Sequence, residues 1–341
     1  MSRFAGVQQA YEKVGSKELS RTCVRVGKAA QSHRTSGHAA EMAFFAVLTL
    51  VPSTIAVGSA LGLSKGLFGA GVVAEAEDAA VGAVSTLMGP ELADTVIAPF
   101  VHAQLSQASS GVAIGGLLIA WYLSSRLFES TGHALDAAYG VTDRRPTVVS
   151  RLLALAFALV SVALVATTVE MMVVGPLGDA DSGLAKWLGL GSAYTVVWSI
   201  VRWPLLLAIV VGFLVCLYRF APNVHEHAWR DCLPGAVVGA ALWIIAATAF
   251  RLTAPLGLRA SEGLAQDDPS VIIIGQSVNA VVSTVVWAYL ASIAILLGGE
   301  FNAARRAKRE DEAADALTLK LFAADDAAPA TAPADVSQST R

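Results

Sequence analysis

Charged residues are scarce in this sequence. Asp, Glu, Lys and Arg make up only 15% of the 341 residues, whereas 55% are hydrophobic. A chain of this composition is hard to keep soluble in water, so the composition indicates lipid as the solvent. The 27 acidic and 24 basic residues leave a net charge of −3, and this total gives no indication of a nucleic-acid partner.

Cysteines are few, and familiar catalytic signatures are absent. The three cysteines, Cys23, Cys216 and Cys232, are far apart, so the sequence predicts neither a disulfide framework nor a CxxC site. There is no P-loop, GxGxxG or HExxH motif. The His-Glu-His run at 225–227 lies near Cys232, but it lacks the spacing of a helical metal-binding pair. We therefore predict no catalytic residue, no metal site and no cofactor.

Long hydrophobic runs, in contrast, recur along the chain. A hydrocarbon core of about 30 Å requires about 20 largely apolar residues in a helix, and only helices or closed barrels satisfy their backbone groups there. Six stretches meet this requirement: Ala39–Leu63, Val112–His133, Leu152–Gly175, Ala193–Phe220, Leu233–Leu252 and Val271–Phe301. The sequence therefore predicts an all-α fold, a polytopic membrane helix bundle of about six transmembrane helices within residues 38–306.

Basic residues are distributed unevenly between the segments that connect these stretches. Most Lys and Arg residues lie before Gly37, after Phe301, or in and beside the loops after the second and fourth stretches: Arg144, Arg145, Arg151, Arg219 and Arg230. The alternate loops contain few of them. Since cytoplasmic loops carry the excess of Lys and Arg, both termini are predicted to lie in the cytoplasm, which agrees with an even number of crossings.

Three segments outside the predicted spans carry predictions of their own. Residues 1–37 are basic, with apolar residues at helical spacing, which fits either an amphipathic helix on the inner leaflet or a solvated helix packed on cytoplasmic loops. The outer segment 64–110 is acidic and is expected to form a helical cap. Residues 307–341 are predicted to be a cytoplasmic tail that is disordered from about residue 323, because its Ala, Pro, Asp and Ser cannot bury a core.

Charged residues within the spans are the first candidates for function, because each costs about 2.5–3.5 kcal/mol at the bilayer centre on insertion scales. Arg126 and Glu129 are three residues apart and share a helical face. Glu41 and Glu300 lie at a similar depth in the first and sixth spans. These four residues could form one cytoplasm-facing cluster, either a polar cavity for a substrate head group or a proton, or a buried ion network that fixes helix packing.

Other residues in the spans are predicted to bend or join helices. Pro52 lacks a backbone donor and should bend or break the first span. Gln276 and Asn279 belong to an uncharged polar stripe on the sixth span, which either bonds to neighbouring helices or lines a transport path. Glu170 and Arg202 lie at similar depth on the third and fourth spans, and we predict that they form a structural ion pair.

Two pairs of glycines have the GxxxG spacing that permits close contact between membrane helices. They are Gly111 with Gly115 and Gly235 with Gly239. Because this spacing is common in membrane helices, we interpret both pairs as ordinary packing positions.

A series of short motifs runs in order between about residues 20 and 306. They are Ala40-Glu41-Met42-Ala43-Phe44-Phe45 with Leu50-Val51-Pro52, Ser125-Arg126 within Trp121–Phe128, Leu217-Tyr218-Arg219-Phe220-Ala221-Pro222-Asn223, Trp229-Arg230, Leu233-Pro234-Gly235-Ala236, Trp287-Ala288-Tyr289-Leu290 and Leu297-Gly298-Gly299-Glu300-Phe301-Asn302. Their order and spacing resemble the YihY/BrkB family of inner-membrane proteins, once labelled ribonuclease BN. One departure is Ile274-Gly275-Gln276, where the family usually shows Tyr-Gly-Ser.

This resemblance implies a multi-pass protein of the bacterial inner (plasma) membrane that is linked to envelope integrity. We accordingly expect a transporter or flippase for a lipid or other amphipathic envelope component, and not an enzyme. Its expected partners are membrane lipids and a lipid or envelope-precursor substrate, with no nucleic acid. The alternative is a non-transporting membrane scaffold for envelope proteins. A ribonuclease is disfavoured because neither an acid/base or metal site nor a basic RNA-binding face is evident.

Overall fold

The protein is built from long helices. The computed structural model describes residues 24–68, 82, 110–142, 145–177, 194–224, 228–264 and 269–326. Its six long helices are α2 (Thr35–Phe68), α6 (Ser110–Ala138), α7 (Thr147–Leu177), α9 (Tyr194–Phe220), α10 (Trp229–Leu264) and α11 (Pro269–Asp326). Each contains a segment long and apolar enough to cross a membrane, and the residues described include no strand. The prediction of an all-α bundle with six spans is confirmed, while the orientation of its termini stays a prediction.

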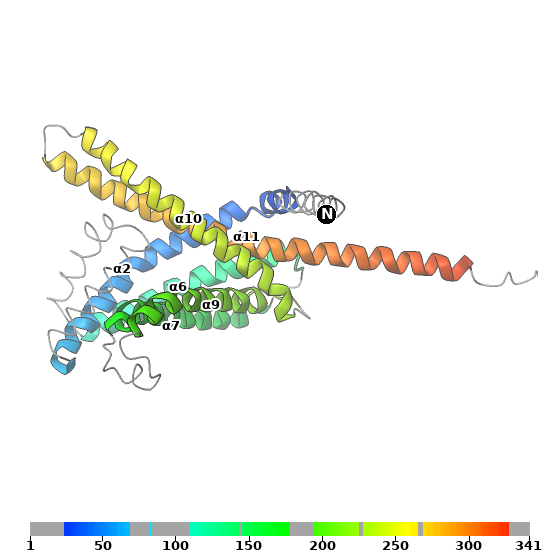
Figure 1. The fold of residues 1–341 in the computed structure, drawn as a ribbon, viewed down its shortest axis with the longest axis horizontal. Helices are drawn as coiled ribbons and strands as arrows, with labels where there is room; N and C mark the ends of the chain where they lie inside the picture. Colours follow the sequence, from blue (N-terminus) through cyan, green and yellow to red (C-terminus); the bar gives the residue numbers. More distant parts are fainter. Residues whose placement is uncertain are drawn as a thin grey trace, which may run out of the picture.

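The helices form two groups that are joined toward one end of the bundle. Figure 1 shows α6, α7 and α9 running together, with α2 packed on α6. The α10 helix and the first half of α11 form a pair that crosses α2 and then separates from α6, α7 and α9. We call the end of the bundle at which α2, α7 and α10 begin the basic end, because Arg145 and Arg306 lie there.

The last helix is much longer than its membrane span. α11 has 58 residues and continues past the predicted end of the span at Phe301 to Asp326 (Figure 1). Residues 302–323 contain neither Gly nor Pro and are rich in Ala, Arg, Lys, Glu and Leu, which favour helix. The pairs Arg306–Glu310 and Lys308–Glu312 add support at i,i+4 spacing. The predicted start of disorder falls near the end of this helix, and residues 327–341 lie outside the described part of the chain.

The α2 helix runs without interruption through Pro52, so the break that the sequence allowed does not occur. Gly116 of α6 packs against this turn, and a Cβ there would lie 3.0 Å from the Pro52 carbonyl oxygen and 3.2 Å from the Ala56 nitrogen. Close packing of a neighbouring helix is one way in which membrane helices tolerate proline. The glycine that makes this contact is not Gly115 of the predicted GxxxG pair, where an added Cβ would have nothing within 4 Å.

Glycines allow α10 and α11 to approach closely near the basic end. A Cβ at Gly235 would lie 2.2 Å from the Gly298 carbonyl oxygen, and a Cβ at Gly298 would lie 3.0 Å from the Gly239 Cα. The fully buried Tyr218 of α9 reaches this seam and donates a hydrogen bond to the Ile295 carbonyl at 2.5 Å. The predicted close contact at Gly235 and Gly239 is therefore confirmed.

Candidate functional site

Two arginines share one glutamate between α6 and α7. Arg126 lies one turn before Glu129 on α6 and pairs with it at 2.8 Å. Arg151, near the start of α7, binds the same carboxylate oxygen. The Arg126 guanidinium lies 5.5 Å from the centroid of the Phe45 ring, and that of Arg151 lies 4.8 Å from the Tyr122 ring. We call Arg126, Glu129 and Arg151 the arginine–glutamate triad.

The triad has an excess of positive charge and is only partly covered. Two guanidiniums share one carboxylate, whose side chain is 12% exposed, whereas Arg126 is 40% exposed. Arg151 lies about 6 Å along α7 from the first residue of that helix, and it directly precedes the predicted span that begins at Leu152. A partly exposed guanidinium in or beside a membrane span is stabilised by an anionic partner through charge-assisted hydrogen bonds.

Glu300 makes its contacts elsewhere. Its carboxylate, which is 2% exposed, lies 3.0 and 3.1 Å from Nδ1 of His33 and accepts a hydrogen bond from the Thr35 hydroxyl at 2.8 Å. His33 and Arg34 form the turn before α2, with Arg34 at a φ of 55°. Glu300 therefore ties the beginning of α2 to α11.

The four charged residues that we considered as one cluster belong to three sets of contacts. Arg126 and Glu129 are together, Glu300 binds the turn before α2, and Glu41, 47% exposed, lies 3.8 Å from His38 on its own helix. Similar depth along different helices does not bring side chains together, because the rotation of each helix decides which neighbour its side chains meet.

Another group of polar contacts closes the basic end between α6, α7 and α9. Arg145 donates to the Asn223 side chain at 2.9 Å and to the carbonyls of Phe220 and Pro222 at 2.7 and 3.2 Å. The Asn223 backbone N–H donates to Asp136 at 2.8 Å. A guanidinium placed here satisfies carbonyls at the C-terminus of α9 and complements the helix dipole.

Arg145→Lys is expected to destabilise the protein by about 1–3 kcal/mol, because an ammonium cannot present the planar fork that reaches three acceptors. Chemical unfolding of the purified protein in detergent would measure this loss. Arg230→Lys, at an exposed position of the same end, is the matched control and should have little effect. Equal stability of the two variants would contradict the assigned role of Arg145.

Cavities near these groups differ in size. The one lined by Glu129, Asp136 and Arg145 has a volume of ≈ 20 Å³, room for about one water molecule. Two larger cavities, of ≈ 250 and ≈ 350 Å³, lie around α11 at the basic end and share Arg306 and Glu310. The cavity beside Glu129 therefore has no room for a substrate. The triad meets the surface of the bundle through Arg126, whose side chain is 40% exposed.

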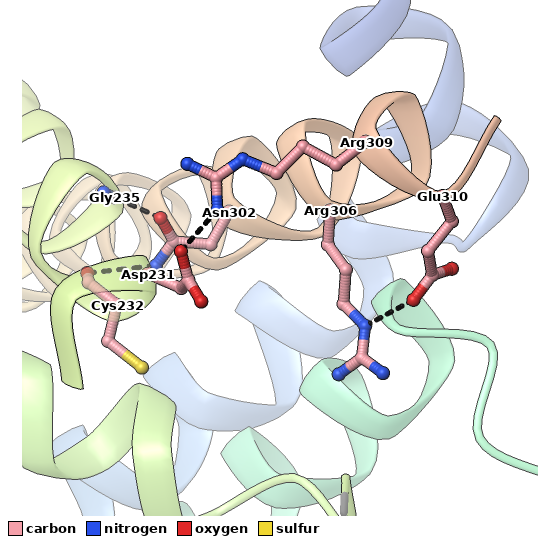
Figure 2. A network of polar contacts seen from close by, with 7 residues as sticks. All are labelled: Asp231, Cys232, Gly235, Asn302, Arg306, Arg309 and Glu310. Atoms are coloured by element: carbon pink, nitrogen blue, oxygen red, sulfur yellow. Dashed lines mark hydrogen bonds and ion pairs between the residues drawn. The ribbon is translucent and has the colours of Figure 1, made fainter. Parts of the chain in front are cut away.

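Asn302, which lines the ≈ 250 Å³ cavity, joins α10 to α11. Its side-chain oxygen accepts a hydrogen bond from the Gly235 N–H at 2.7 Å, and its amide donates to the Cys232 carbonyl at 2.9 Å (Figure 2). Tyr139 borders the ≈ 350 Å³ cavity, and burial raises the pKa of its phenol, so this side chain stays neutral at physiological pH. The contact between α10 and α11 is thus held by the uncharged amide of Asn302.

The remaining predicted site residues are only partly described. Asn279 is half-buried on α11. The side chains of Gln276 and Glu170 lie outside the described residues, and the predicted pair of Glu170 with Arg202 stays a prediction. Arg202 stacks over the Trp203 ring at 5.3 Å.

Several other predictions fall on segments that the structure does not describe: the helix within residues 1–23, most of the cap at 64–110, and the 225–227 run. Within the described ranges, no group of three or more His, Cys, Asp or Glu side chains could hold a metal ion.

Sequence reasoning missed the partners of two of its own candidates. The sequence places Arg151 only beside a span, although it completes the contacts of Glu129. His33 and Thr35 precede the first predicted span, yet they bind Glu300. Their places in the sequence could have indicated these contacts. Arg151, His33 and Thr35 all lie at ends of spans that the predicted topology puts on the same side of the membrane as the end of the sixth span.

These observations define an α-helical integral membrane protein with six candidate spans among its described residues. The family described as "Virulence factor BrkB" matches residues 26–260, and the chain belongs to this family. The chain is also 27% identical over 291 residues to the "Putative ribonuclease-like protein YfkH" of Bacillus subtilis (strain 168), which covers 82% of this chain and 94% of that protein. No solved structure matches. The predicted YihY/BrkB resemblance is confirmed.

Proposed function

We propose that this protein is a transporter or flippase of the bacterial inner membrane, with both termini in the cytoplasm. Its cargo is a lipid or other amphipathic envelope component, recognised by an anionic head group. The observation that carries this proposal is the arginine–glutamate triad, in which two guanidiniums share one carboxylate and Arg126 is 40% exposed. An anionic head group would balance this charge at the level of the lipid head groups.

The surroundings of the triad suit the apolar part of such a molecule. Phe44 and Tyr122, on α2 and α6 near the triad, are 61% and 54% exposed. Exposed aromatic and aliphatic side chains on a membrane helix contact acyl chains, and Tyr is favoured where hydrocarbon meets water.

Reconstituted protein is expected to move a fluorescent anionic lipid between leaflets. The measurement is the fraction of labelled phosphatidylglycerol that dithionite reduces from outside the vesicles, compared with protein-free vesicles and with labelled phosphatidylcholine. Arg126→Gln and Arg151→Gln should each slow the movement about tenfold, since one hydrogen bond to a charged group contributes about 1.5 kcal/mol.

The matched control is Lys320→Gln, which removes a positive charge from an exposed position beyond the bundle. The melting temperature of each variant is measured as well, and only variants that melt as the wild type does are compared. Loss of lipid movement is then separated from loss of folding. If wild-type protein moves neither anionic lipids nor a panel of envelope precursors faster than empty vesicles, the proposal fails.

A scaffold for envelope proteins remains the second candidate, and the free-standing part of α11 favours it. Residues 307–320 are exposed, and Leu317 and Leu319 are 60% and 70% exposed. Cross-linking in membranes that recovers one stoichiometric partner through this helix would support a scaffold. We propose no enzymatic activity, and RNA cleavage by the purified protein that is lost on adding a metal chelator would contradict this.

A further inference from the structure

Two cavities adjoin on the part of α11 that leaves the bundle. The cavity of ≈ 250 Å³ is lined by Asp231, Asn302, Arg305, Arg306, Arg309 and Glu310. The cavity of ≈ 350 Å³ shares Arg306 and Glu310 and is also bordered by Thr142 and Asn223. We call the two together the arginine groove. Its volumes lie near the lower end of the range for small-molecule sites.

The described lining of the arginine groove has an excess of positive charge, because it contains three arginines and the two carboxylates of Asp231 and Glu310. Figure 2 shows Arg309 directed at Asp231 of α10, while Arg306 is paired with Glu310 of its own helix at 2.7 Å. Arg305 stacks on the Phe301 ring at 5.9 Å. The groove thus presents guanidiniums from successive turns of one helix.

The carboxylates within the groove are weak competitors for a stronger anion. The Glu310 side chain is 64% exposed, and Arg309 and Asp231 are 57% and 39% exposed. Exposed ion pairs of this kind contribute little, since water and salt screen them and long side chains must be ordered. A ligand with more charge and more acceptor oxygens would displace Glu310 from Arg306.

We infer that the arginine groove binds a phosphate group. A planar guanidinium can donate to two phosphate oxygens at once. A phosphate group has enough oxygens to accept from more than one arginine of the groove, whereas a single carboxylate has only two. Phe301 marks the predicted end of the hydrophobic run, so Arg305 and Arg309 lie one to about two turns beyond it. Both a lipid phosphate head group and a soluble phosphate compound can reach that level.

This site is separate from the arginine–glutamate triad and does not depend on transport. The triad lies between α6 and α7, whereas the groove is formed by α11 with the beginning of α10 and the segments after α6 and α9. If the groove does not bind phosphate, the proposed transport function is not contradicted. If the protein does not move lipids, the inferred phosphate site is not contradicted.

The test uses the full chain and two phosphate probes at constant ionic strength. Inorganic phosphate is titrated into the protein in neutral detergent, with calorimetry as the readout. In the second arm, the melting temperature is compared in nanodiscs of phosphatidylcholine with and without phosphatidic acid, whose phosphate has no choline attached, because a ligand that binds only the folded state raises it. Saturable binding in the first arm identifies a soluble phosphate, and stabilisation in the second identifies a head group.

Substitutions of opposite sign test the groove itself. Arg306→Gln and Arg305→Gln should each weaken binding about tenfold, whereas Glu310→Gln should strengthen it by removing the competing carboxylate. Lys308→Gln, on the same helix but outside both linings, should bind as the wild type does. The inference is overturned if neither probe binds or if Glu310→Gln weakens binding. It is also overturned if Lys308→Gln lowers the affinity as much as Arg306→Gln does while all variants have the same melting temperature.

Discussion

Gly235→Ala is expected to destabilise the protein by about 3 kcal/mol or more, because an added methyl has no space at the seam of α10 and α11. Its Cβ would lie 2.2 Å from the Gly298 carbonyl oxygen and 2.3 Å from Cγ of Asn302. The Gly298 carbonyl belongs to the backbone of α11 and cannot rotate away as the end of a flexible side chain can. The two helices must therefore move apart. That movement would also stretch the hydrogen bond from the Gly235 N–H to Asn302.

Unfolding in detergent with increasing SDS would measure this loss, and Gly115→Ala and Gly212→Ala are the controls. Both glycines lie within helices and have nothing within 4 Å of the added methyl. Alanine favours helix over glycine by about 1 kcal/mol in water, so the controls should be neutral or slightly stabilised. A Gly235→Ala protein as stable as these controls would refute the close approach of α10 and α11.

Glu300→Ala is expected to destabilise the protein by about 3 kcal/mol, since it leaves His33 and Thr35 without their buried acceptor. Thr35 is 5% exposed, so water cannot readily replace the lost hydrogen bond. The same change releases the turn before α2 from α11. Residues 24–32, the helical segment before that turn, should then become accessible to protease, which mass spectrometry of the fragments would detect.

Glu300→Gln separates hydrogen bonding from charge at this position. The amide oxygen can still accept from the Thr35 hydroxyl, so this variant should lie between the wild type and Glu300→Ala. Glu312→Gln is the control, because Glu312 is 65% exposed and pairs with Lys308 across an exposed turn at 3.6 Å. Equal stability of Glu300→Ala and Glu312→Gln would show that the buried carboxylate does not hold α2 to α11.

Much of the fold could be predicted because membrane helices are specified locally. Each backbone group in hydrocarbon must bond within its own helix, so a hydrophobic run of sufficient length is enough to place a span. The boundaries were less predictable. α10 begins at Trp229 rather than Leu233, and α11 runs on to Asp326, because helix propensity continues where hydrophobicity ends.

The family motifs acquire physical roles only when the helices are packed. Gly298 and Gly299 lie where a Cβ would meet the Tyr218 hydroxyl at 2.4 Å and the Leu135 side chain at 2.3 Å. Glu300 and Asn302, which follow them, bind the beginning of α2 and of α10. One short stretch of α11 thus contacts α2, α6, α9 and α10, although the motif by itself indicated only a resemblance.

The sequence by itself determined that this is a membrane protein of six helical spans and to which family it belongs, because hydrophobic length and ordered motifs are properties of the chain alone. Only the tertiary structure decided that Glu129 meets Arg151, that Glu300 meets His33, and that Arg306 borders two cavities. The physical reason is that sequence specifies how deep a side chain lies along its helix. The rotation and crossing of packed helices decide which side chain it faces.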